Sequence, residues 1–214
     1  MSKESSSHGD RYDTRGNPEA EYVDGARTVL VNKLGIMSLG VLQEAEEEGL
    51  ATAYRSLLKE VRADTPLTCE LIRYAHWLIF NDLYEWAGKW RTVWISKPGA
   101  TWPPPDFLEA SMREYEKSVL LRHAASALAD DDEFCRGAAE IQGEFLVIHP
   151  FREGNARTIK LITDLLAAQT QRPLLRYDAS SEGRDAYVLA ARAAFKRDYA
   201  RFEAIIRQAL AEAR

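Results

Sequence analysis

The side chains best suited to chemistry lie together in one short stretch, from His149 to Lys160. The imidazole of His149 can accept a proton near neutral pH. The carboxylate of Glu153 is a suitable ligand for a hard divalent cation, and the guanidinium of Arg157 follows one helical turn later. A base, a metal ligand and a cation at this spacing indicate phosphoryl or nucleotidyl transfer.

The backbone of the same stretch predicts a binding place for an anion. Pro150 should end the preceding helix, because proline has no amide donor. Gly154 and Asn155 tolerate unusual backbone angles, and a new helical pattern begins at Ala156. A helix start leaves unpaired amides and a positive dipole end. We therefore predict a phosphate cradle beside the three reactive groups.

Two amphipathic helices should hold this stretch in place. Apolar residues recur at helical spacing from Asp131 up to His149, and again from Asn155 to about Thr170. The predicted inward residues are Phe134, Ala138, Ile141, Phe145 and Ile148 before the stretch, and Ile159, Ile162 and Leu166 after it. Both helices read as buried, so we expect the loop between them to be rigid.

The remaining pattern is also helical. We predict helices over 38–63, with a possible break at Gly49, from Thr65-Pro66 to about Trp86, over 181–195 and over 198–211. A further helix follows Pro105 and buries Leu108, Met112, Tyr115 and Val119. The acidic run Glu44, Glu46, Glu47 and Glu48 is interpreted as a solvated face, and His76 as a packed structural histidine.

One segment, residues 90–102, breaks the helical period. Its β-branched and aromatic residues partly alternate and are followed by a turn-like Lys97-Pro98-Gly99-Ala100. We predict a β-hairpin, with a surface loop as the alternative. The fold class is therefore all-α with one inserted hairpin. We divide the chain into a polar arm (1–25, mobile or loosely docked), a helical extension (26–65) and the main domain (66–214).

Composition excludes several classes of protein. The 214 residues carry a net charge of −5, which disfavours bulk nucleic-acid binding. No apolar run approaches the ~20 residues that span a bilayer. The polar start has no hydrophobic core of a signal peptide, and the two cysteines are interpreted as thiols in a reducing cytoplasm.

The stretch resembles the Fic-domain signature H-x-F-x-[D/E]-G-N-x-R, matched by His149, Phe151, Glu153, Gly154, Asn155 and Arg157. Residues 29–36 resemble the V-L-x-N-K-x-G-I lead-in of bacterial Fic domains, and residues 76–88 resemble their H-x-x-[LI]-F…[YF]-x-W-A-G segment. The resemblance implies a Fic-type helical domain whose hairpin is a flap.

The resemblance also implies roles. ATP would bind over Gly154, Asn155, Ala156, Arg157 and Lys160, with Mg²⁺ held by Glu153 and His149 acting as the base. The flap would hold a target protein by main-chain pairing, through Val93, Trp94, Ile95, Ser96 and Lys97. The implied reaction transfers AMP to a Ser, Thr or Tyr hydroxyl of that protein.

Two departures from the family form leave alternatives open. Ala156 stands where the family usually has Gly, and Lys160 where it often has a second Arg. A phosphotransferase, a transferase of another nucleotide, or a degenerate fold that only binds a partner therefore remain as alternatives. No Glu-Gly pair has Ser or Thr four residues before its Glu, as an internal inhibitory helix would require. This implies restraint by a small separate antitoxin.

Overall fold

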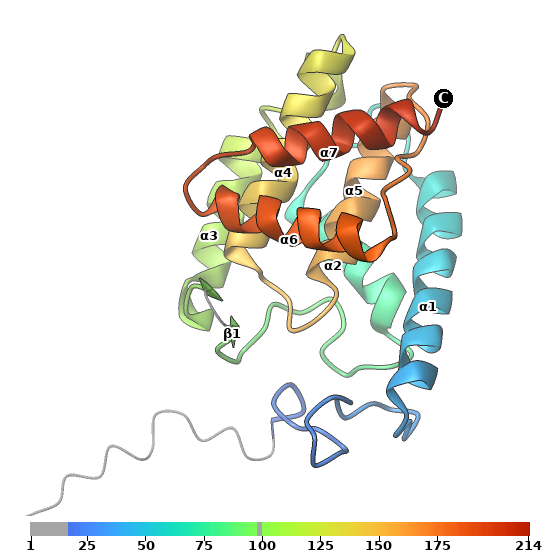
Figure 1. Cartoon of the computed structure of the whole chain (residues 1–214), viewed down its shortest axis with the longest axis vertical. Coiled ribbons are helices and arrows are strands. Elements are labelled where there is room, and N and C mark those ends of the chain that lie inside the picture. Colours follow the sequence, from blue (N-terminus) through green and yellow to red (C-terminus); the bar gives the residue numbers. More distant parts are fainter. Residues whose placement is uncertain (1–16, 98–99) are drawn as a thin grey trace, which may run out of the picture.

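The computed structural model describes residues 17–97 and 100–214, which form seven α-helices and one two-stranded hairpin (Figure 1). The helices are α1 (Leu39–Glu60), α2 (Cys69–Phe80), α3 (Leu108–Tyr115), α4 (Asp131–Ile148), α5 (Asn155–Gln169), α6 (Ser181–Ala194) and α7 (Ala200–Ala211). Strands β1 (Ser96–Lys97) and β2 (Ala100–Thr101) pair antiparallel. The prediction of an all-α fold with one inserted hairpin is confirmed.

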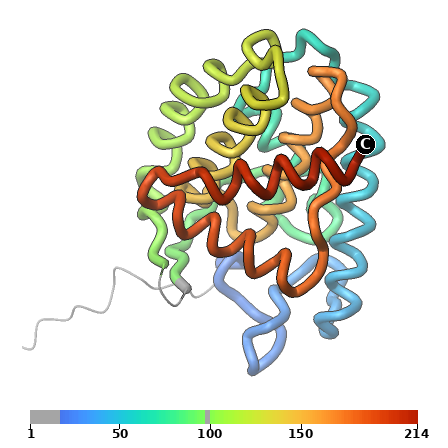
Figure 2. The backbone as a smooth tube through the Cα atoms, turned by 45° about the horizontal axis from the view of Figure 1, so that its top comes forward, coloured from blue at the N-terminus to red at the C-terminus, as the bar shows by residue number. Residues whose placement is uncertain are grey.

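Helices α4 and α5 form the centre of the domain. All the inward positions predicted for them are buried, and buried residues such as Cys135, Gln142 and Thr158 lie outside those stripes, as expected for central helices. Helices α6 and α7 run side by side across α4 (Figure 2), and α1 lies along one edge against α2 and α5. No helix in the described ranges is long and apolar enough to cross a membrane.

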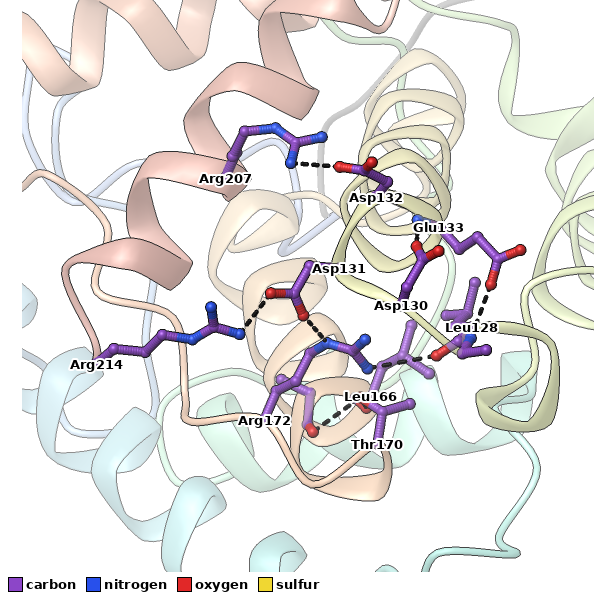
Figure 3. Close-up of polar contacts among 12 residues, drawn as sticks. Leu128, Asp130, Asp131, Asp132, Glu133, Leu166, Thr170, Arg172, Arg207 and Arg214 are labelled. Carbon is purple, nitrogen blue, oxygen red and sulfur yellow. Dashed lines mark hydrogen bonds and ion pairs between the residues drawn. The ribbon is translucent and has the colours of Figure 1, made fainter.

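The start of α4 is tied to two other parts of the domain by charged contacts (Figure 3). Asp130 caps the helix by accepting the N–H of Glu133 at 2.8 Å. Asp131 accepts from Arg172, just beyond α5, at 2.9 Å, and Asp132 pairs with Arg207 of α7 at 2.7 Å. These contacts fix the end of α4 that lies opposite the signature loop.

Helix α2 is shorter than the sequence predicted. It begins at Cys69, with the Thr68 side chain accepting from the N–H of Leu71 at 3.1 Å. The prediction of a start at Thr65 is wrong because the Thr65 hydroxyl instead accepts from the N–H of Arg62. The helix ends at Phe80, not Trp86, since a chain of turns buries Leu83, Tyr84, Trp86 and Ala87 together, which a straight helix could not do.

Helix α1 runs without a break through Gly49, contrary to the possible break expected there. At this position α1 lies so close to α2 that an added Cβ would be 2.1 Å from the carbonyl oxygen of Ile79. The interpretation of the acidic run as a solvated face is wrong for Glu46, which is buried, while Glu44, Glu47 and Glu48 are exposed.

The described end of the expected N-terminal arm is docked on the domain; residues 1–16 lie outside the described residues. Glu19 is buried and accepts the N–H of Thr92 at 2.8 Å. Arg152, in the signature loop, donates to the Glu19 carbonyl and to the hydroxyl of Tyr22. The segment that precedes α1 therefore contacts both the signature loop and the approach to the hairpin.

Candidate active site

The signature loop connects α4 to α5 and begins with an abrupt change of backbone direction. His149 has φ 52° and ψ 59°, in the left-handed region, while its N–H donates to the Phe145 carbonyl at 2.8 Å. A left-handed residue at a helix end stops the helix and redirects the chain. Pro150 and Phe151 then turn into the core, where both are buried. This bend places the imidazole at the end of α4.

The loop is closed by contacts between its own residues. The side-chain amide of Asn155 accepts the N–H of Phe151 at 2.9 Å and donates to the Phe151 carbonyl at 2.8 Å. Gly154 has φ +77°, and an added Cβ would lie 2.2 Å from the Phe80 ring. Both the oxygen and the nitrogen of the Asn155 side chain are thus hydrogen-bonded within the loop, and its backbone begins α5.

His76, on α2, supports this loop from beneath. Its ring stacks on Phe151 with centroids 3.7 Å apart, and its Nδ1 accepts the N–H of Gly88 at 2.8 Å. Its Nε2 donates to the Glu153 carbonyl at 3.1 Å. Burial lowers the pKa of His76 to about 3, so the ring is neutral at physiological pH. The interpretation of His76 as a packed structural histidine is confirmed, but no sequence pattern indicated that the signature loop would be its partner.

Arg91 joins the signature loop to the base of the hairpin. Its role was not predicted from the sequence. Its guanidinium is buried and donates to the carbonyls of His149 at 2.9 Å, Val93 at 2.8 Å and Pro103 at 2.7 Å. Its own N–H donates to the Pro150 carbonyl at 2.8 Å. Burial lowers the pKa of Arg91 to about 10, which still leaves it charged at neutral pH.

We expect Arg91→Lys to destabilise the protein by about 2–3 kcal/mol, because an ammonium cannot reach three divergent carbonyls. Urea unfolding measures this change. The control is Arg55→Lys on α1, whose exposed guanidinium donates to the nearby Thr52 hydroxyl at 2.8 Å, and we expect less than about 0.5 kcal/mol there. Equal losses in the two variants would contradict the role given to Arg91.

The His149 ring lies against Trp102 at the exit of the hairpin, with centroids 4.3 Å apart. Trp102 is held by its indole N–H, which donates to the Leu146 carbonyl at 2.8 Å. Nδ1 of His149 is buried. Trp102, which follows the hairpin, therefore sets the orientation of the imidazole of His149.

The predicted flap residues lie between Arg91 and Trp102. Val93 is buried, whereas Trp94 is 51% exposed. Ser96 pairs with Thr101 in the hairpin, and Lys97 pairs with Ala100. The predicted turn residues 98–99 lie outside the described residues. The hairpin is thus anchored at its base by buried Val93, and the exposed ring of Trp94 lies beside that anchor.

Glu153 and Arg157 line one cavity of about 730 Å³, together with Glu46 and Tyr84. Arg157 lies over the Phe80 ring and pairs with Glu46 at 2.7 Å; its distance to Glu153 is 3.6 Å. The hydroxyl of Tyr84 donates to Glu46 at 2.6 Å. Helix α1 thus contributes the buried carboxylate of Glu46 to the site. The sequence pattern had predicted that this side chain would face solvent.

We expect Glu46→Gln to destabilise the protein by about 1–3 kcal/mol, because it leaves the half-buried Arg157 without its nearest counter-charge. Glu47 lines the same cavity but is exposed, so Glu47→Gln is a matched control with an expected change below about 0.5 kcal/mol. Chemical unfolding of both variants tests this, and identical midpoints and slopes would contradict it.

Lys160 does not share the cavity of Glu153 and Arg157. Its Nζ lies 4.3 Å from the ring centroid of Tyr177 and 4.1 Å from that of Tyr187, in a second cavity of about 590 Å³. Ala156 is half-buried in the first turn of α5, against the core. The structure therefore brings together His149, Glu153, Gly154, Asn155, Ala156 and Arg157 around one loop, and directs Lys160 elsewhere.

Within the signature loop, Glu153 is the one carboxylate that could hold a divalent ion, while Glu46 and Glu47 line the same cavity from α1. Among the residues that the structure describes there is no group of three or more His, Cys, Asp or Glu residues placed to hold a metal. Glu153 is 46% exposed at the cavity, and its Oε1 accepts the N–H of Gly154 at 2.9 Å. One carboxylate fits Mg²⁺ bound mainly through substrate phosphates and water, as Mg²⁺ often is.

Comparison with known proteins agrees with this geometry. Residues 66–167 match the model of the Fic/DOC family. The chain is 31% identical over 152 residues to protein adenylyltransferase VbhT of Bartonella schoenbuchensis, and 30% identical over 130 residues to "Probable protein adenylyltransferase y4lH" of Sinorhizobium fredii. The first alignment covers 70% of this chain and 30% of VbhT; the second covers 61% and 66%, respectively. The chain therefore spans less than a third of the length of VbhT.

Solved structures show the same fold. The N-terminal Fic domain of Bep8 from Bartonella sp. 1-1C superposes with a TM-score of 0.74 at 18% identity, covering 88% of this chain and 94% of that one. BepC from Bartonella tribocorum, described with bound AMPPNP, gives 0.70 at 18% identity and covers 90% and 97%. Fold and signature together define a Fic-type helical domain with a flap. This protein is a Fic-domain protein of the Fic/DOC family.

Proposed function

We propose that the protein transfers AMP from ATP to a Ser, Thr or Tyr hydroxyl of a target protein. The observation that carries this proposal is the signature loop itself, which begins with an imidazole at the end of α4 and leads through Glu153 to the N-terminus of α5. Glu153 and Arg157 line one cavity. The names of the relatives as adenylyltransferases, and the description of BepC with an ATP analogue, support it further.

In the proposed reaction, the target hydroxyl oxygen attacks the α-phosphorus of ATP. A new O–P bond forms, the bond from the α-phosphorus to the bridging oxygen breaks, and pyrophosphate leaves. His149 takes the hydroxyl proton, and we assign this to Nε2 because Nδ1 is buried. The first amides of α5, at Asn155, Ala156 and Arg157, stabilise the charge that develops on phosphate oxygens.

The other predicted residues have supporting roles in this proposal. Arg157 contacts the departing phosphates, and Glu153 would hold Mg²⁺, which lowers the charge of the triphosphate. The flap residues from Val93 to Lys97 would align the target chain by strand addition. Restraint by a separate antitoxin, and action in the cytoplasm or after secretion, are further parts of the proposal.

The test is incubation of the purified protein with a cell lysate and ATP labelled at the α-phosphate, beside ATP labelled at the γ-phosphate. We expect label on protein only from the α position, and none when His149 is replaced. Transfer of the γ-label would indicate a phosphotransferase. Transfer of label from UTP would indicate a transferase that uses another nucleotide. Absence of transfer from every nucleotide would support a binding module instead.

A further inference from the structure

The phosphate end of the candidate site holds little uncompensated positive charge. Arg157 pairs with Glu46 at 2.7 Å and lies 3.6 Å from Glu153, so two carboxylates already offset its charge. A leaving pyrophosphate carries several negative charges, and cations aimed at that charge are what stabilise such transition states. A second cation is therefore expected beside Arg157.

Lys160 is poorly placed to be that cation. Its ammonium lies over the faces of Tyr177 and Tyr187, a favourable cation–π arrangement that would be lost if the side chain moved. The hydroxyls of these two tyrosines are both bonded to Gln142, at 2.6 and 2.7 Å, so the rings are fixed. Lys160 also faces the second cavity, which is lined from the α6–α7 side.

Arg184, in the first turns of α6, reaches the cavity of Arg157 instead. Among the residues that line this cavity, only Arg157 and Arg184 carry positive charge. Arg184 is exposed, and its Nη1 donates to the Ala179 carbonyl at 2.6 Å, a contact within its own loop. Within the described residues no carboxylate pairs with Arg184 inside 4.0 Å. Asp178 is a nearby acid: its pKa is lowered mainly by Ser180 and to a lesser degree by Arg184.

We propose that Arg184 binds the terminal phosphates of the nucleotide and replaces the second signature cation, while Lys160 serves to hold α6 against α5. This inference rests on the proposed function, since it assumes that ATP occupies the cavity of Arg157. Arg184 is long and exposed, so its guanidinium can exchange the Ala179 carbonyl for a phosphate, with which guanidinium pairs through two parallel hydrogen bonds.

The experiment compares nucleotide binding by calorimetry for a non-hydrolysable ATP analogue and for AMP. We expect Arg184→Gln to weaken the ATP analogue about tenfold, the effect of one charge-assisted contact, and to leave AMP within about twofold. Lys160→Met should leave the affinity for both nucleotides within about twofold and lower the melting temperature. Arg201→Gln, an exposed arginine on α7 that lines neither cavity, is the matched control and should change neither quantity.

The outcomes separate this inference from the proposed function. If the unaltered protein binds no nucleotide, both fail. If it binds the ATP analogue and Arg184→Gln binds it equally well, or loses AMP to the same extent, the role of Arg184 is overturned and the proposed function stands. A tenfold loss in a Lys160→Met protein that remains folded by circular dichroism overturns it as well, because the cation would then be Lys160.

Discussion

Replacement of His149 by alanine is expected to reduce AMP transfer by ~10²–10⁴-fold, the contribution of a well-placed general base. The imidazole stands at the end of α4, against Trp102, and its carbonyl is held by Arg91. The substitution removes the ring and leaves these backbone contacts in place. Binding of a non-hydrolysable ATP analogue should therefore persist while transfer is lost.

The backbone of His149 calls for a second variant. Because the residue is left-handed, the Cβ of histidine and that of alanine both carry a strain of about 1–2 kcal/mol there, whereas asparagine tolerates this conformation better. His149→Asn should lose transfer to the same extent and unfold closer to the unaltered protein. Transfer rates of both variants, measured with α-labelled ATP, check the prediction. If either variant kept more than a tenth of the rate, His149 would not be the base.

Gly154→Ala is expected to destabilise the protein by about 2–4 kcal/mol and to abolish nucleotide binding. Two effects combine: φ is +77°, which disfavours any side chain, and the new Cβ would lie 2.2 Å from Phe80. Phe80 is itself buried and packs on His76, with ring centroids 4.7 Å apart, so it has little room to move. The loop would have to shift, and the first amides of α5 with it.

The matched control is Ala156→Gly, two residues further on, which restores the glycine usual in the family. At a helix start it should change stability by less than about 1 kcal/mol and preserve binding. A second variant, Gly154→Ala with Phe80→Leu, removes part of the clash but not the backbone strain, so it should remain less stable than Phe80→Leu alone. Thermal unfolding and nucleotide titration test the set. A Gly154→Ala protein with unaltered stability and affinity would contradict the prediction.

The local part of the site could be predicted because it depends on neighbouring residues. Pro150, Gly154 and Asn155 determine a helix end and a helix start within a few residues, and the apolar stripes on either side determine that both helices are buried. Alternation and turn residues likewise predicted the hairpin. Chain order and side-chain period are sufficient for such features.

The supports of the site could not be predicted in this way. Glu46, Arg91 and Arg152 are charged residues, which sequence patterns place on the surface, yet each bonds to a partner far along the chain. The start of α2 was also misplaced, because two threonines compete as caps and a contact to Arg62 removes one of them.

The sequence alone therefore determined the reactive groups, their order around one loop and the helical class of the fold. Only the tertiary structure decided which charges face that loop: it turned Glu46 inward to Arg157 and put Lys160 between two tyrosines in another cavity. The physical reason is that the energy of a charge depends on which distant groups exclude water from it, and packing sets those neighbours.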